Sequence, residues 1–208
     1  MHVAGESFSS RKARGGSLTL GRRQTATGRK YLRGPRGSGF LYAREGAAAA
    51  AGEPAAGDVW GARWVGRDAY EFVGDAKRYE QYETSFAAKV GLGEAIRYAL
   101  DVGVDRIAAT VGPLAAELRE RLRGLAGVAV HDRGAVLCGI VSFTKAGVDP
   151  EAAKARLAEA GISVTVSAVR STRIAMEVQG LEAVLRASVH YYNNAGEVER
   201  FAAAVDRL

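Results

Sequence analysis

Apolar residues in the second half of the chain follow helical spacing in some segments and strand spacing in others. Residues 105–125 carry Val111, Leu118 and Leu122 along one helical face, although Gly112-Pro113 should kink or divide that helix. Asn194 begins a last helix with an acidic partner three residues later, a capping-box spacing. Strand patterns occupy residues 127–131, 136–144, 162–167 and 184–192. We therefore predict an α/β fold, with helices on a mostly antiparallel sheet.

Shorter signals complete this pattern. Asp149-Pro150 predicts a helix start, and Gly161 predicts its end. Residues 39–43, GFLYA, indicate a short buried strand, whereas the Ala-rich residues 45–57 indicate a surface loop. Thr84 or Ser85 caps a helix whose apolar positions recur at helical spacing as far as a stop at Gly103.

Three regions follow from these patterns. Residues 1–24 show no periodicity and few large apolar side chains, so we expect a disordered basic leader. Residues 25–104 form a second region that ends in the helix capped near Ser85. Residues 105–208 form the C-terminal α/β domain.

The net charge of +6 belongs to the beginning of the chain. Residues 1–36 hold nine Lys and Arg against one acid, whereas the remainder carries slightly more acid than base. Nucleic-acid binding by the folded body is therefore not expected. The chain contains one cysteine, which excludes an internal disulfide and suits a reducing compartment, so we expect a cytoplasmic protein. It contains no apolar run long enough for a membrane span, and no metal site is predicted.

The stretch TATGRKYLRGPRGSGFLYAR, residues 25–44, combines hydroxyls, cations and glycines. Thr27 and Arg29 offer donors to an anion, and the glycines allow backbone N–H groups to approach it. Lys30 lies among arginines that favour a neutral, carbonyl-attacking amine. A pyridoxal phosphate site needs both features, because the ligand carries an aldehyde and a phosphate. A flexible arm that touches RNA without specificity has the same composition.

Arg186 is the second candidate. Strand parity places Leu185, Ala187 and Val189 on one face and Arg186 on the other, away from the core. A guanidinium fixed on a strand suits a carboxylate of the substrate. The strand pattern by itself favours a merely solvated arginine.

Three segments, in order, resemble the class V aminotransferases, a fold-type I family of pyridoxal phosphate enzymes. TATGRKYLRGPRGSGFLY is similar to the cofactor-lysine segment, and KRYEQYETSFAAKVGLGEAIRYALDVGVDRI is similar to the stretch that follows it. CGIVSFT and VLRASVHYYNNAGEVERF resemble the C-terminal domain. The subgroup that this sequence most resembles is that of isopenicillin N epimerase-like and hercynylcysteine sulfoxide lyase-like proteins.

The resemblance implies roles for four residues and a cofactor, pyridoxal 5'-phosphate. Lys30 matches the lysine bound covalently to the cofactor, and Thr27 and Arg29 match positions that contact its phosphate. Arg186 matches the arginine that holds the α-carboxylate of an amino-acid-like substrate. The family also implies a homodimer.

In the family, a residue of the partner subunit also reaches the phosphate. Its counterpart lies near Arg63 and Trp64, where the usual Gly-Thr is absent, so this position stays unassigned. Residues 25–104 then correspond to a remnant of the large cofactor-binding domain with its connecting helix, and residues 105–208 correspond to the small domain.

Two departures from the family pattern limit the function. Desulfurases carry a mobile cysteine in the loop before the arginine strand, and SAVRSTRIAMEVQG has none. Cys138 falls in a predicted buried strand and serves as a small hydrophobe. This disfavours desulfurase chemistry and leaves transamination, racemisation or C–S bond cleavage.

The second departure concerns the residues before the lysine. The family's ring-pairing aspartate lies far upstream of that residue, yet here 24 residues precede Thr25. The chain therefore resembles the C-terminal half of an enzyme, which implies a truncated form or a complementing N-terminal half. The alternative is a non-catalytic α/β dimerisation module with a basic arm for anionic partners.

Overall fold

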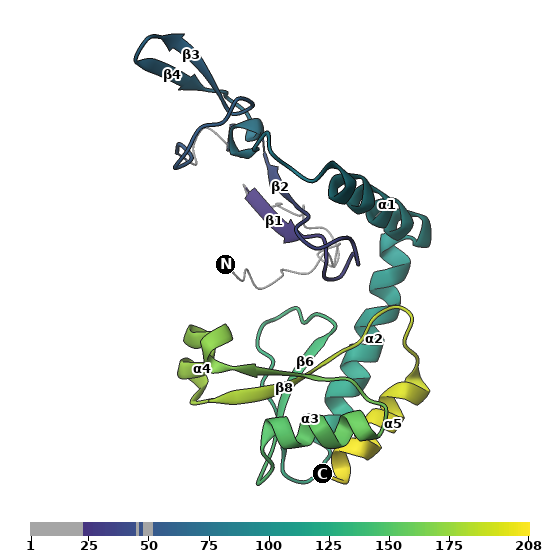
Figure 1. Ribbon diagram of the computed structural model, residues 1–208. Coiled ribbons are helices and arrows are strands. Elements are labelled where there is room, and N and C mark those ends of the chain that lie inside the picture. Colours follow the sequence, from purple (N-terminus) through teal and green to yellow (C-terminus); the bar gives the residue numbers. More distant parts are fainter. Residues whose placement is uncertain (1–22, 45, 48–51) are drawn as a thin grey trace. The chain divides into compact units, whose positions relative to one another are not determined.

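The computed structural model of the protein describes residues 23–44, 46–47 and 52–208. Most of the expected leader, residues 1–22, and part of the Ala-rich loop, residues 45 and 48–51, lie outside this range. The described chain forms two compact units, one before Gly103 and one from Gly103 to Leu208 (Figure 1). None of the helices in the described part combines the length and apolarity that crossing a membrane requires.

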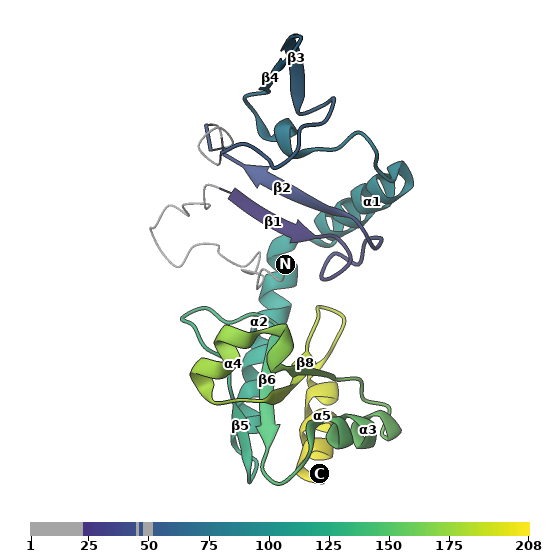
Figure 2. The same cartoon turned by 60° about the vertical axis from the view of Figure 1, so that its left-hand side comes forward.

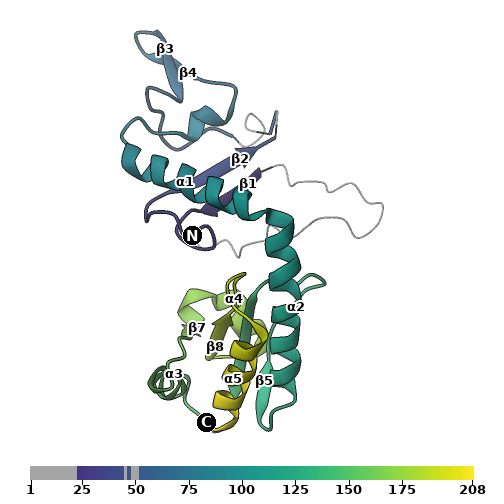
Figure 3. The same ribbon diagram turned by 90° about the vertical axis from the view of Figure 1, so that its right-hand side faces the viewer.

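The second unit is a four-stranded antiparallel sheet with helices packed on it, which confirms the predicted α/β class (Figures 1 and 3). The strand order is β5-β6-β8-β7. Its strands are β5 (Val128–Val130), β6 (Ile140–Lys145), β7 (Thr165–Ala168) and β8 (Ala183–Ser188). Its helices are α2 (Val104–Arg123), α3 (Pro150–Glu159), α4 (Arg173–Gln179) and α5 (Ala195–Asp206), with a short 3-10 helix η3 (Val169–Ser171) before α4.

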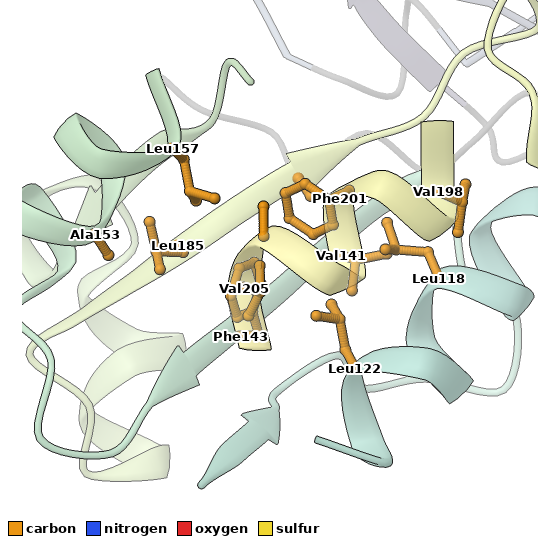
Figure 4. Close-up of a cluster of buried hydrophobic side chains, with 12 residues drawn as sticks. Leu118, Leu122, Val141, Phe143, Ala153, Leu157, Leu185, Val198, Phe201 and Val205 are labelled. Atoms are coloured by element: carbon orange, nitrogen blue, oxygen red, sulfur yellow. The ribbon is translucent and has the colours of Figure 1, made fainter. Parts of the chain in front are cut away.

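One face of this sheet forms the core, because alternate residues of each strand point to the same side. Val141 and Phe143 of β6 are fully buried, beside Leu185 of β8. Figure 4 shows them against side chains of α2, α3 and α5. The rings of Phe143 and Phe201 meet edge to face, with centroids 5.9 Å apart. The expected stripe of the last helix is confirmed at Val198, Phe201 and Val205, which are all buried.

The predicted helix ends are present. Asp149 caps α3 by accepting a hydrogen bond from the Ala152 N–H at 2.9 Å, with Pro150 in the first turn. Asn194 and Glu197 form the capping box of α5. Of the two expected effects of Gly112-Pro113, a kink or a division, the division does not occur, because α2 runs unbroken through Pro113. Buried side chains on both sides of the proline, at Val111 and Ala115, hold the helix against the core.

The first unit consists of two hairpins and a helix (Figure 2). The strands β1 (Arg23–Thr27) and β2 (Gly39–Ala43) pair antiparallel, as do β3 (Ala62–Gly66) and β4 (Ala69–Phe72). A 3-10 helix, η2 (Ala76–Tyr79), precedes α1 (Phe86–Val102). Strand β2 is the predicted GFLYA strand, partly rather than fully buried. Strand β1 was not predicted, and it includes two residues assigned to the leader.

Helix α1 starts where expected, since the Ser85 hydroxyl accepts a hydrogen bond from the Ala88 N–H at 3.2 Å. Its apolar positions divide between two faces. Leu92 is buried, whereas Phe86, Val90 and Leu100 are each more than 60% exposed. The helical spacing therefore predicted the helix correctly, but most of its apolar side chains lie on the surface of this unit.

A buried ion pair joins helix α2 to the sheet. Arg119 Nε donates to Asp132 at 2.7 Å, and both side chains are less than 10% exposed. Arg119 Nη2 also donates to the carbonyls of Cys138 at 2.6 Å and Ile140 at 2.9 Å. The second oxygen of Asp132 accepts the Ser142 N–H at 2.8 Å. Every connection runs to the β5–β6 loop (residues 131–139) or to β6, so this pair fixes that loop to the helix.

Replacing Arg119 with Ala should destabilise the second unit by about 3–5 kcal/mol, because it leaves Asp132 buried and uncompensated. Urea unfolding followed by circular dichroism measures the change. Arg121→Ala is the control, since the Arg121–Glu117 pair on the same helix is partly exposed and should cost about 0.5 kcal/mol or less. Equal losses in the two variants would contradict this account.

Candidate functional site

The loop between β1 and β2 presents the predicted cofactor residues. Its two ends are joined by a bond from the Gly28 N–H to the Ser38 carbonyl at 2.8 Å. Inside the loop, the Arg33 N–H donates to the Lys30 carbonyl at 3.0 Å and the Gly34 N–H donates to the Gly28 carbonyl at 2.9 Å. These bonds fold residues 28–38 into consecutive turns. The backbone of Lys30 is therefore held in a defined geometry and does not belong to an extended arm.

Close packing against α1 fixes the start of the loop. Gly28 is buried, and a Cβ built on it would come within 2.6 Å of the Leu92 side chain and 2.5 Å of the Ser38 hydroxyl. Further along, the Arg33 guanidinium lies 5.3 Å from the ring centroid of Tyr98. The loop thus rests on one face of α1, and a side chain at position 28 would have to displace the Leu92 side chain and the Ser38 hydroxyl.

Thr27, Arg29 and Lys30 are all exposed. Among the residues that the structure describes, none forms a hydrogen bond or an ion pair with these three side chains. The Arg33 guanidinium contacts the ring of Tyr98 on α1. The expectation that the arginines near Lys30 favour its neutral, carbonyl-attacking form stays a prediction.

The three side chains nevertheless suit the cofactor implied by the sequence. An unengaged primary amine, a hydroxyl and a guanidinium stand within four residues on a structured loop. Pyridoxal phosphate needs an amine for its aldehyde and donors for its phosphate. Lys30 would hold the first group, and Thr27 and Arg29 would hold the second. The first unit by itself leaves the Lys30 amine exposed.

Arg186 lies in the second unit, on β8, with the side-chain direction that parity predicts. Leu185 and Ala187 are buried in the core, whereas Arg186 points to the opposite face and is half-buried. Its Nη1 donates to the Ser167 hydroxyl at 3.3 Å. None of the carboxylates in the described chain forms an ion pair with it. The guanidinium is therefore held by one hydrogen bond to a neutral group and, within the described chain, is not neutralised by a carboxylate.

The segment that holds a cysteine in desulfurases is ordered here. It forms η3 and α4, and Gly180, with φ of +64°, closes α4. Met176 is buried and anchors the helix. Cys138 does not lie in a strand, as the sequence pattern suggested, but precedes β6 in the β5–β6 loop and is half-buried.

The unassigned phosphate-contact position falls on strand β3. Arg63 and Trp64 both lie exposed on β3, with the Trp64 ring edge-on to Tyr70 at 6.1 Å between centroids. No cluster of three or more metal-binding side chains occurs within the described ranges. Sequence reasoning missed Ser167, since only the pairing of β7 with β8 brings it beside Arg186.

Comparison with known proteins gives a consistent result. Residues 24–201 match the family Aminotransferase class-V. A probable cysteine desulfurase of Mycolicibacterium paratuberculosis is 35% identical over 138 residues, 66% of this chain and 20% of the relative. The solved apo cysteine desulfurase of Thermococcus onnurineus is 28% identical, with a TM-score of 0.76 over 89% of this chain and 46% of that one. C-DES, solved with glycine covalently linked to its PLP cofactor, is 22% identical with a TM-score of 0.65, covering 86% of this chain and 44% of that one, and shows the fold alone.

The chain therefore spans less than half of the length of these relatives. Their descriptions do not include the epimerase-like or sulfoxide lyase-like proteins, so that subgroup assignment stays a prediction.

Substituting Gly28 with Ala should destabilise the first unit by about 1–3 kcal/mol, because the methyl group overpacks the contact with Leu92 and Ser38. Thermal unfolding of the two variants and the wild type tests this. Gly93→Ala is the matched control, since nothing lies near its Cβ and the change should stabilise α1 by roughly 0.5–1 kcal/mol. A Gly28→Ala protein as stable as Gly93→Ala would rule out the proposed packing.

His131 gives the second unit a pH dependence. Burial lowers the pKa of His131, and the nearby Asp132 charge opposes this without cancelling it. Its Nε2 forms a 2.8 Å hydrogen bond with Thr144 Oγ1. The unfolded chain, with a histidine pKa of about 6.5, takes up the proton first, so the free energy of unfolding should fall as pH falls through about 6.5. His131→Gln has no such group, so its free energy of unfolding should not show this fall. The difference in free energy of unfolding between the wild type and His131→Gln should therefore shrink as the pH is lowered from about 7.5 to 5.5. A gap that stays constant or widens contradicts the prediction.

Proposed function

Because this chain belongs to the class V aminotransferase family, whose cofactor is pyridoxal 5'-phosphate, we propose that it forms part of an enzyme that cleaves a C–S bond in an amino acid. The observation that carries the proposal is the structured loop that displays an unengaged Lys30 beside Thr27 and Arg29. C–S cleavage is favoured over transamination and racemisation, because the relatives at 35% and 28% identity are cysteine desulfurases.

Each residue has a separate task in this proposal. Lys30 anchors the cofactor aldehyde, and Thr27 and Arg29 donate to its phosphate. Arg186 holds the substrate α-carboxylate, which its lack of an ion-pair partner in the described chain leaves it free to do. The bound cofactor supplies an electron sink for the bond-breaking at the amino acid.

The proposal departs from the desulfurases in the fate of the sulfur. A desulfurase uses a cysteine on the segment before the arginine strand, and here that segment is an anchored helix without cysteine. Cys138, the chain's one cysteine, is half-buried in another loop. The sulfur-containing fragment is therefore released as a small molecule and not carried on the protein.

The exposure of Lys30 defines what the rest of the assembly must provide. Water competes for every hydrogen bond at an open site, and exclusion of water strengthens the electrostatic contacts to the phosphate. We propose that a complementing N-terminal half, or a second copy in a homodimer, supplies the missing walls. The exposed apolar residues Phe86, Val90 and Leu100 on α1 are consistent with such a covering surface.

Reductive trapping tests the cofactor role on the full chain. After incubation with pyridoxal phosphate and borohydride, peptide mass spectrometry should find the pyridoxyl group on Lys30, and Lys30→Ala should lose most of the label. Lys89→Ala is the matched control, because Lys89 is also exposed in the first unit and should leave labelling unchanged. Uniform labelling of exposed lysines, including Lys30 at no higher level than Lys89, would defeat the proposal for this chain.

A further inference from the structure

The face of the second unit's sheet that lies opposite the core is lined by hydroxyl groups around Arg186. In the sheet register, Arg186 stands between Ser142 on β6 and Thr165 on β7. Ser167 is two residues beyond Thr165 on the same face. This row provides neutral hydrogen-bonding groups beside a single guanidinium.

Within this row, Ser167 is distinguished by burial and by contact. It is 6% exposed, whereas Thr165 is exposed, and its Oγ accepts a hydrogen bond from Arg186 Nη1 at 3.3 Å. An arginine has five N–H donors in a planar fork. One bond to a buried hydroxyl on a neighbouring strand restricts rotation of the guanidinium and leaves its other N–H donors for a ligand.

The chemistry of the acceptor also matters. A carboxylate at this position would pair with Arg186 and neutralise it, because charge-assisted, bidentate pairs are the strongest contacts that arginine makes. A hydroxyl is neutral, so it orients the guanidinium without neutralising its positive charge. Orientation before binding lowers the entropic cost of forming a bidentate carboxylate contact.

We infer that Ser167 is a positioning residue that presents the Arg186 guanidinium to the α-carboxylate of an amino-acid substrate. The inference rests on the proposed function for the identity of the ligand. It assigns to Ser167 an effect through Arg186, with no contact of its own to the substrate.

Side-chain ¹⁵N NMR of the full chain tests the positioning directly. In the wild type, rotation of the Arg186 guanidinium should be slower than that of the exposed Arg170. Ser167→Ala should speed the rotation, and Ser167→Thr should restore it. Thr165→Val, which removes the hydroxyl of a register neighbour, is the matched control and should change nothing. Equal rotation in the wild type and Ser167→Ala overturns the inference, whatever the enzyme does.

A ligand titration tests whether Arg186 binds a carboxylate and whether Ser167 assists it. S-methyl-L-cysteine should shift the Arg186 Nε resonance, whereas its methyl ester, which has no carboxylate charge, should not. Ser167→Ala should weaken the affinity about three- to tenfold, a typical loss for one hydrogen bond. Ser167→Asp should abolish this shift, because its carboxylate would occupy the Arg186 guanidinium. Unchanged affinity in Ser167→Ala overturns the substrate role of Ser167.

The two arms separate failure of this inference from failure of the proposed function. If the wild type shows no response to S-methyl-L-cysteine, the carboxylate role of Arg186 fails for this chain by itself, and with it the purpose assigned to Ser167. If the slow rotation of Arg186 still depends on the Ser167 hydroxyl, their hydrogen bond has a structural role only. A response in the wild type that Ser167→Ala weakens and Ser167→Thr restores supports both.

Discussion

The second unit depends on a charge pair that cannot be solvated. Arg119 and Asp132 are both nearly buried, and together they satisfy two carbonyls and one N–H around the β5–β6 loop. Burying two charges is favourable only when each is fully engaged. Because α2 supplies one charge and the loop supplies the other, the register of helix, loop and β6 is set together. β6 pairs with β5 on one side and with β8 on the other, and β8 carries Arg186. The contact therefore fixes the position of β6, the strand beside the candidate clamp.

Local patterns predicted most of the elements, because capping residues and apolar periodicity act over a few positions. Asp149, Ser85 and Asn194 each begin a helix as expected. Helix α4 was not predicted; of its apolar residues Ile174, Met176 and Val178, only Met176 is buried, so the helix has no apolar stripe at helical spacing. Pro113 does not divide α2, because tertiary burial on both sides of it outweighs the local cost of a proline.

The sequence predicts which residues belong to the candidate site, but not the contacts that they make. The strand parity of Arg186 follows from sequence, but its contact with Ser167 requires the register between β7 and β8, which no local pattern specifies. In the same way, nothing in the sequence distinguishes Arg119 from its solvated neighbours on α2. The arginines near Lys30 are visible in the sequence, but the contact of Arg33 with the Tyr98 ring on α1 requires the packing of the loop on that helix.

The tether between α2 and the β5–β6 loop has a practical meaning for the chain's single thiol. The Cys138 carbonyl accepts a hydrogen bond from Arg119, so the exposure of its half-buried thiol depends on whether the loop stays attached to α2. The rate at which a thiol-reactive dye modifies Cys138 would then report local opening of this loop. Slow modification indicates that the loop is attached to α2, and fast modification indicates that it has detached while the sheet remains folded.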